Sequence, residues 1–284
     1  MRTRRLTALG AALLAGLASG PQHAAVDLDA LWDFAQPARS EQRFRDALAS
    51  AGGDDALVLR TQIARTHSLR RQFDLALREL DALEPLLAKA GPAPRVLALL
   101  ERGRTLRSSG QAAAAEPLFR RAFELANRAQ LERLAADALH MVALVQTDPA
   151  QQLAWNRRVV DYARAAVDPQ ARRWDAVALN NMGVTLNDLG RHAEALEVLR
   201  EAQRAYERSG RPDNVRIARW MVAHTLRLAG RAEEALPMLR TLEAEWAEAG
   251  RPDPYVFDEL AEVFATTGDA DRAAYYRALA KAKR

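Results

Sequence analysis

Small and apolar residues recur along the chain at intervals close to 40 residues. The segment LGRHAEALEVLR at 189–200 is matched by AGRAEEALPMLR at 229–240, and the loop Gly-Arg-Pro-Asp at 210–213 returns at 250–253. Two independent matches at one spacing indicate an internal repeat. An alanine anchors each of about six units, which lie 38–41 residues apart: Ala76, Ala115, Ala154, Ala195, Ala235 and Ala273.

Each unit predicts two antiparallel helices joined by a tight turn. A small or compact residue twelve places before the anchor, such as Gly183, lets the two helix axes approach closely. An apolar residue four places after the anchor, such as Leu199, extends the buried face. Four units carry a glycine in the turn, where it permits the left-handed backbone that ends a helix: Gly110, Gly190, Gly230 and Gly268. The third unit is degenerate, because it lacks this glycine and has Arg158 where an apolar residue is expected.

The residues on either side of the repeats predict caps. Residues 28–34 and 38–50 favour a short helix and a longer one within a capping segment at 25–54, and the repeats follow at 55–284. Trp32 and Phe44 are expected to cover the apolar end of the first unit. At the other end, Tyr275, Tyr276 and Leu279 predict a terminal helix. Such caps are expected because each unit of a repeat protein buries its faces only against its neighbours.

The pattern within a unit resembles the tetratricopeptide repeat. Small residues at places eight and twenty, glycine at fifteen and alanine at twenty-seven match best in the fourth unit, LNNMGVTLNDLGRHAEALEVLREA at 179–202. The resemblance covers the chain from about Ala56 onward. It implies an all-α fold, a right-handed solenoid of antiparallel helix pairs.

The first 24 residues have the layout of a secretory signal peptide. Arg2, Arg4 and Arg5 form a basic start, and residues 6–17 form an uncharged apolar run that is too short for a membrane-spanning helix. Cleavage is expected near Ala24. We therefore expect a periplasmic or secreted bacterial protein, with a misassigned start of a cytoplasmic protein as the alternative.

Charge and cysteine content narrow the classes of partner. The formal net charge is +4, and removal of the three arginines of the first 24 residues leaves +1. A nearly neutral chain has no general attraction for nucleic acid or for an anionic membrane surface. We therefore expect no nucleic-acid partner and no stable membrane insertion after cleavage. The chain has no cysteine, which excludes disulfides and thiolate metal sites.

No catalytic motif appears in the sequence. The five histidines, among them His140 and His224, stand in no metal-binding spacing, and there is no phosphate-binding glycine loop and no serine nucleophile motif. We expect neither enzyme activity nor a cofactor or metal.

The resemblance implies that places two, five, six, nine and twelve of each unit face a concave groove. The residues of interest at these places are Arg65, Arg104, Arg107, Leu139, His140, Gln146, Asn180, Asn181, Asn187, Trp220, His224, Arg227, Tyr255, Asp258, Glu259 and Glu262.

The chemistry of these side chains suits a peptide. Adjacent asparagines are poor helix formers, but their amides can donate to and accept from an extended backbone. Trp220 and Tyr255 are side chains of the kind that anchor interfaces, and arginines can hold carboxylates. Plainer alternatives are that the arginines form a solvated face, that Asn181 links neighbouring helices, and that Trp220 belongs to the core.

Three functions follow in order of preference. The first is a non-catalytic scaffold that binds a protein or peptide partner in the groove. The second is a ligand sensor, as in bacterial regulators whose tetratricopeptide domains bind signalling peptides. The third is a helical-repeat hydrolase of cell-envelope material, which would need paired carboxylates near Asp258, Glu259 and Glu262.

Overall fold

The computed structural model describes residues 26–283, and within this range its regular structure is helical throughout. The expected signal peptide at 1–24 lies outside the described residues. Six helix pairs follow one another: α3 (Gly53–Leu69) with α4 (Phe73–Leu87), α5 (Pro92–Ser108) with α6 (Ala112–Arg128), α7 (Glu132–Val145) with α8 (Pro149–Ala165), α10 (Trp174–Asp188) with α11 (His192–Ser209), α12 (Pro212–Leu228) with α13 (Ala232–Glu248), and α14 (Pro254–Thr266) with α15 (Ala270–Ala282). Three further helices are α1 (Leu28–Leu31), α2 (Pro37–Leu48) and α9 (Pro169–Arg172).

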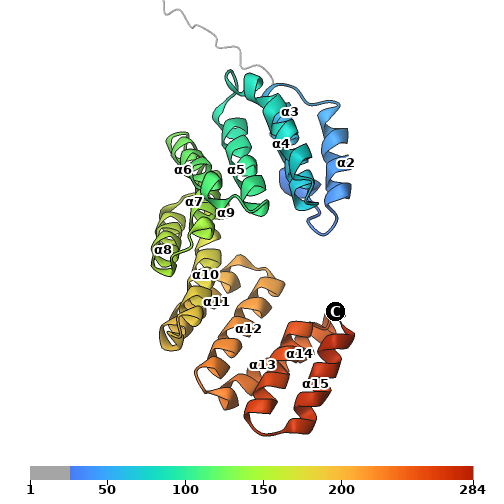
Figure 1. The fold of residues 1–284 in the computed structure, drawn as a ribbon, viewed down its shortest axis with the longest axis vertical. Coiled ribbons are helices and arrows are strands. Elements are labelled where there is room, and N and C mark those ends of the chain that lie inside the picture. Colours follow the sequence, from blue (N-terminus) through green and yellow to red (C-terminus); the bar gives the residue numbers. More distant parts are fainter. Residues whose placement is uncertain (1–25, 284) are drawn as a thin grey trace, which may run out of the picture.

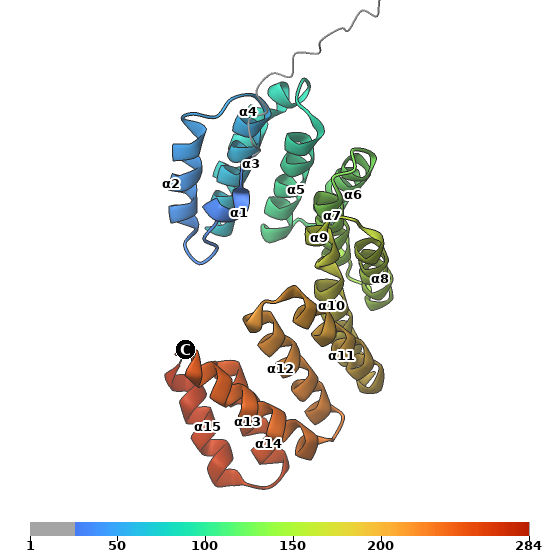
Figure 2. The ribbon, with the colours of Figure 1, turned by 180° about the vertical axis from the view of Figure 1, so that it is seen from behind.

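The pairs stack into a right-handed solenoid that curves into an arc (Figure 1). The first helices of successive pairs contact one another at every junction from α3 to α14, whereas the second helices of neighbouring pairs are splayed apart. The closely spaced first helices therefore line the concave face. Figure 2 shows α2 and α15 on the open side of the arc and α6, α8 and α11 at its outer edge. None of the helices between residues 26 and 283 combines the length and apolar character needed to cross a bilayer.

The small residues lie where the helices of a pair cross, as the sequence predicts. A Cβ atom added to Gly183 would lie 2.3 Å from Cγ of Leu199, and one added to Gly103 would lie 2.4 Å from the ring of Phe119. Both partner side chains are fully buried. The turn glycine Gly190 has φ of 71°, in the left-handed region that a side chain disfavours.

The third unit differs from the prediction, because Ala154 is exposed rather than buried. Helix α8 begins seven residues after Val142, whereas α11 begins nine residues after Gly183, so the register of α8 is shifted by two residues. Gln152 consequently takes the anchor place. Asn156, which is 3% exposed, takes the place that Leu199 fills in unit four. Without a turn glycine, α7 ends early, and an alignment on alanine alone misses the shift.

The ends of the solenoid are covered by aromatic side chains. Phe44 of α2 packs with Leu59 and Ile63 of α3, and its ring meets that of Trp32 edge-on at 5.0 Å, as predicted for the first unit. At the other end, α15 is the predicted terminal helix with Tyr275, Tyr276 and Leu279, and it is the second helix of the sixth unit. Its Tyr276 stacks on Phe264 with ring centroids 5.8 Å apart.

Candidate binding groove

Two of the three arginines predicted in the first half of the groove, Arg65 and Arg104, are held by carboxylates of α5 and α7. Nη1 of Arg65 lies 3.3 Å from Oε1 of Glu101. Arg104 contacts the same oxygen through Nη1 at 2.6 Å and Oδ1 of Asp137 through Nη2 at 2.5 Å. Glu101 is completely buried. Burial raises the pKa of Asp137, but the Arg104 guanidinium outweighs this and holds that pKa below its usual value. Two guanidinium groups thus meet two carboxylates, and the predicted basic end of the groove is largely neutralised.

His140 continues this row as a neutral side chain. Its ring packs against Trp174 with centroids 4.9 Å apart. Burial, together with Arg104 and Arg107 and despite Asp137, lowers the pKa of His140 to about 4. The imidazole is therefore uncharged near neutral pH. Within residues 26–283, its Nδ1 is buried without a hydrogen-bond partner.

The chain's own N-terminal segment covers the inner face of the first unit. Nε1 of Trp32 donates to Oε1 of Gln62 at 3.1 Å, and the Arg65 guanidinium lies 5.3 Å from the ring of Phe34. The segment extends across the arc, where Asp29 meets Arg133 of α7 at 2.6 Å. This part of the concave face is occupied.

Arg107 and Gln146 complete the predicted set in the first half. Arg107 is exposed and forms no ion pair with any described residue. Gln146 follows the last turn of α7, and its amide nitrogen donates to the carbonyl of Val142 at 2.9 Å, so it serves the end of that helix. Of the described side chains Arg65, Arg104, Arg107 and Gln146, Arg107 is therefore the one that is exposed and not engaged by a described residue.

The three asparagines of α10 have different environments. Nδ2 of Asn187 donates to Oγ1 of Thr225 at 2.7 Å and so links α10 to α12. Such a link between neighbouring helices is one of the roles that the sequence allows for Asn181. The Asn181 amide is half-buried and makes no hydrogen bond to a described residue. Oδ1 of Asn180 is buried and has no partner among residues 26–283. The two adjacent asparagines that the sequence places in the groove, Asn180 and Asn181, are thus available to a ligand.

Helices α12 and α14 bring the remaining predicted residues together. Trp220 stacks on His224 at 5.1 Å, and its Nε1 donates to the carbonyl of Tyr255 at 3.1 Å. Glu259 lies 2.9 Å from Nδ1 of His224 and 2.5 Å from Nε of Arg227. Burial raises the pKa of Glu259, but these two partners outweigh it, and the pKa lies below its usual value. Glu259 is therefore a carboxylate that orders the cluster.

An apolar strip adjoins this cluster. Tyr255 is 63% exposed and Ile217 48%, and Val184 on α10 is also exposed. Ile217 and Trp220 share a face of α12 because they stand three residues apart. We call Val184, Ile217, Trp220 and Tyr255 the inner strip. Val184 and Ile217 stand at groove places nine and two of their units, so the same rule places them in the groove, although the prediction did not name them.

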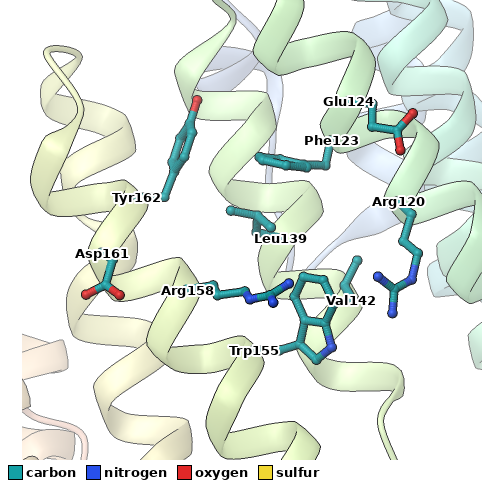
Figure 3. Close-up of a pocket in the computed structure, with 9 residues that line it drawn as sticks. All are labelled: Arg120, Phe123, Glu124, Leu139, Val142, Trp155, Arg158, Asp161 and Tyr162. Carbon is teal, nitrogen blue, oxygen red and sulfur yellow. The ribbon is translucent and has the colours of Figure 1, made fainter.

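A cavity of about 480 Å³ lies outside the groove, between the second helices α6 and α8, with α7 as its floor (Figure 3). We call it the outer pocket. Leu139, predicted to face the groove, lines the floor of this pocket instead. The lining residues are Arg120, Phe123, Glu124, Leu139, Val142, Trp155, Arg158, Asp161 and Tyr162.

The described residues hold no group of three or more histidine, aspartate and glutamate side chains placed to bind a metal. On α14, the carboxylates that the hydrolase hypothesis needs are engaged: Glu259 by His224 and Arg227, and Glu262 by Arg277 at 3.3 Å. The chemistry of the concave face is thus that of a surface with hydrogen-bonding and apolar groups.

Comparisons with known proteins agree with this architecture. The family model of the tetratricopeptide repeat matches residues 174–244. RapI in its apo form has a TM-score of 0.69 and 12% identity, over 89% of this chain and 74% of RapI. NprR in complex with its cognate peptide NprX has a TM-score of 0.53 and 13% identity, over 89% of this chain and 76% of NprR.

A tetratricopeptide repeat protein from Parabacteroides merdae has a TM-score of 0.52 and 13% identity, over 90% of this chain and 91% of that one. No curated protein matches the sequence. At these identities the solved structures show the fold alone. The chain is a helical repeat protein, and the tetratricopeptide repeat is matched in it at residues 174–244.

Proposed function

We propose that this protein is a non-catalytic scaffold that binds an extended peptide segment of a partner protein on the inner face of α10, α12 and α14. The observation that carries the proposal is the inner strip. Large apolar side chains that remain exposed on a concave face, with polar groups around them, are typical of a binding site. Trp220 and Tyr255 are residue types that are enriched at the energetic centre of interfaces.

The asparagines beside the strip supply hydrogen bonds for a peptide backbone. A buried amide oxygen without a partner costs about 1–3 kcal/mol, so a ligand N–H that reaches Asn180 relieves this cost. Asn180 is half-buried as a residue, so we expect its amide to be within reach of a ligand in the groove. Asn181, one residue on, offers a second free amide.

We place the peptide on α10, α12 and α14 because side chains on the remaining concave face, on α3 and α5, already contact other parts of the chain. Gln62 and Arg65 are engaged by the N-terminal segment, and Arg104 by Glu101 and Asp137. A peptide would have to break these contacts to lie on α3 and α5. On α10 to α14 it meets exposed side chains instead. The structural likeness to NprR, which was solved with its cognate peptide, supports a peptide as the ligand class.

Selection from a phage-displayed library of random twelve-residue peptides tests the proposal. We expect enriched peptides that bind the wild-type chain and carry bulky apolar residues for the strip. Trp220→Ala should weaken an enriched peptide about thirtyfold and Asn180→Ala about tenfold, as expected for a hot-spot aromatic and a satisfied buried acceptor. Binding is measured by titration calorimetry, and circular dichroism checks that each variant is folded.

Matched controls exist elsewhere on the molecule. Tyr275 of α15 is an exposed aromatic residue and Asn127 of α6 an exposed asparagine, both outside the groove. Tyr275→Ala and Asn127→Ala should leave the affinity unchanged. If the library yields no binder, or if the groove and control variants lose affinity equally, the proposed site is wrong.

Two narrower proposals accompany the main one. We propose that the mature protein works in the periplasm or outside the cell, supported by the signal-like residues 1–24, and N-terminal sequencing of the native protein would show whether they are removed. A sensing role would require that the bound peptide changes the conformation of the solenoid. Small-angle scattering with and without an enriched peptide measures that change directly.

A further inference from the structure

The outer pocket arises from the altered register of the third unit. Because α8 is shifted by two residues, Trp155 is buried and Arg158 is exposed. Its volume, about 480 Å³, lies within the range of small-molecule sites. Figure 3 shows its apolar lining: Phe123 from α6 and Trp155 and Tyr162 from α8 at the sides, and Leu139 and Val142 from α7 at the floor. The pocket therefore accepts an apolar body.

Its aromatic walls favour a flat ligand. Phe123 and Tyr162 meet edge-on with ring centroids 5.8 Å apart, across the mouth from Trp155. Aromatic rings attract one another in edge-to-face and offset arrangements, beyond the gain from buried area. Leu139 at the floor contributes an aliphatic surface on which a ring can lie.

Two guanidinium groups converge on one side of this pocket. Arg120 lies 4.5 Å and Arg158 4.4 Å from the ring centroid of Trp155, on either side of the indole in Figure 3. Arg120 is paired with Glu116 at 2.6 Å, whereas Arg158 forms no ion pair with any described residue. Arg158 thus lies close to a second guanidinium group across the Trp155 ring and has no counter-ion among the described residues, so it attracts an anion.

The acidic residues of the lining do not cancel this attraction. Figure 3 shows the carboxylates of Glu124 and Asp161 at the outer flanks, turned away from the two guanidinium groups. The side of the pocket next to Trp155 is therefore basic, and the opposite side is apolar.

We propose that the outer pocket binds a small aromatic carboxylate, with its ring against the apolar surface formed by Phe123, Leu139 and Tyr162 and its carboxylate accepting hydrogen bonds from Arg158. This site lies on the convex side of the arc and is separate from the peptide groove. It requires neither the groove nor its ligand.

Titration calorimetry of the full chain with 2-naphthoate and with its neutral analogue 2-naphthamide tests this proposal. We expect saturable binding of the carboxylate at a single site and about tenfold weaker binding of the amide, because the amide forfeits the charge-assisted hydrogen bonds. Arg158→Gln should weaken 2-naphthoate about tenfold and leave 2-naphthamide unchanged. Arg157→Gln, at the adjacent exposed arginine of α8, should change neither.

Filling the cavity gives a second, independent measurement. Val142→Phe should abolish binding of both compounds, and thermal unfolding shows whether the variant remains folded. Equal affinity for carboxylate and amide, equal effects of Arg157→Gln and Arg158→Gln, or unchanged binding in a folded Val142→Phe variant would each overturn the proposal. So would the absence of saturable binding to the wild-type chain.

Discussion

Replacing Asn156 by leucine should stabilise the protein. Asn156 takes the core place that Leu199 fills in unit four, and it is 3% exposed. Its Nδ2 donates to the carbonyl of Gln152 at 2.9 Å, but its Oδ1 is buried without a partner among the described residues. Leucine has the same number and branching of side-chain heavy atoms, is somewhat larger, and has no polar atom to satisfy. The substitution therefore removes a polar defect and adds apolar contact.

The magnitude follows from these contacts. Loss of the hydrogen bond to Gln152 costs about 1 kcal/mol, relief of the unpaired oxygen returns about 1–2 kcal/mol, and burial of the apolar side chain adds about 1.5 kcal/mol. The expected net gain is about 2 kcal/mol. Urea unfolding followed by circular dichroism should show a higher midpoint with an unchanged slope.

The matched control is Asn127→Leu, at an exposed asparagine of α6, which should change the unfolding free energy by less than about 0.5 kcal/mol. Asn156→Ala separates the two contributions, since it removes the defect but leaves a cavity. A destabilised Asn156→Leu variant beside a neutral Asn127→Leu variant would refute the reasoning, because it would mean that Oδ1 of Asn156 forms a valuable contact.

Two further predictions concern the core and its pH dependence. Gly183→Ala should destabilise the protein by about 1–3 kcal/mol despite the better helix propensity of alanine, because its Cβ would lie 2.3 Å from Leu199. The loss of unfolding free energy should be smaller in a Leu199→Ala background, and thermal unfolding measures both variants. His140 has a pKa of about 4 in the folded protein and 6.5 as an ordinary value, so the unfolded chain binds more protons between these values. Acidification from pH 6.5 to 4 should therefore lower the unfolding free energy, and His140→Phe should reduce this slope in denaturant unfolding at several pH values; an unchanged slope would show that His140 does not carry it.

The repeat architecture was predictable because its determinants are local. Gly183, Gly190 and Ala195 stand at fixed spacings within one helix pair, and each reports a close contact or a turn between residues near in sequence. The register of the third unit was not predictable. Ala154 has the spacing of an anchor alanine, but the two-residue shift of α8 depends on where α7 ends. Residue identity alone does not show that helix end.

The groove was predictable only in part for a similar reason. Trp220 and Tyr255 meet across neighbouring helices, as their places in the repeat imply. The carboxylates that pair with Arg65 and Arg104, by contrast, are Glu101 on α5 and Asp137 on α7, so a list of cationic residues alone overlooks the groups that neutralise them. The contact of Trp32 with Gln62 was not predictable from the repeat pattern either, because Trp32 belongs to the segment that precedes the repeats.

The most direct test of the central claim is photo-crosslinking. A library-selected peptide that carries a benzophenone side chain at its central residue is irradiated on the wild-type chain, and the crosslinked residues are identified by mass spectrometry. The account predicts crosslinks to α10, α12 and α14 near Val184, Ile217 and Tyr255, which disappear when the unlabelled peptide competes. Crosslinks confined to the convex helices α6 and α8, or to the outer face of α15, would contradict it.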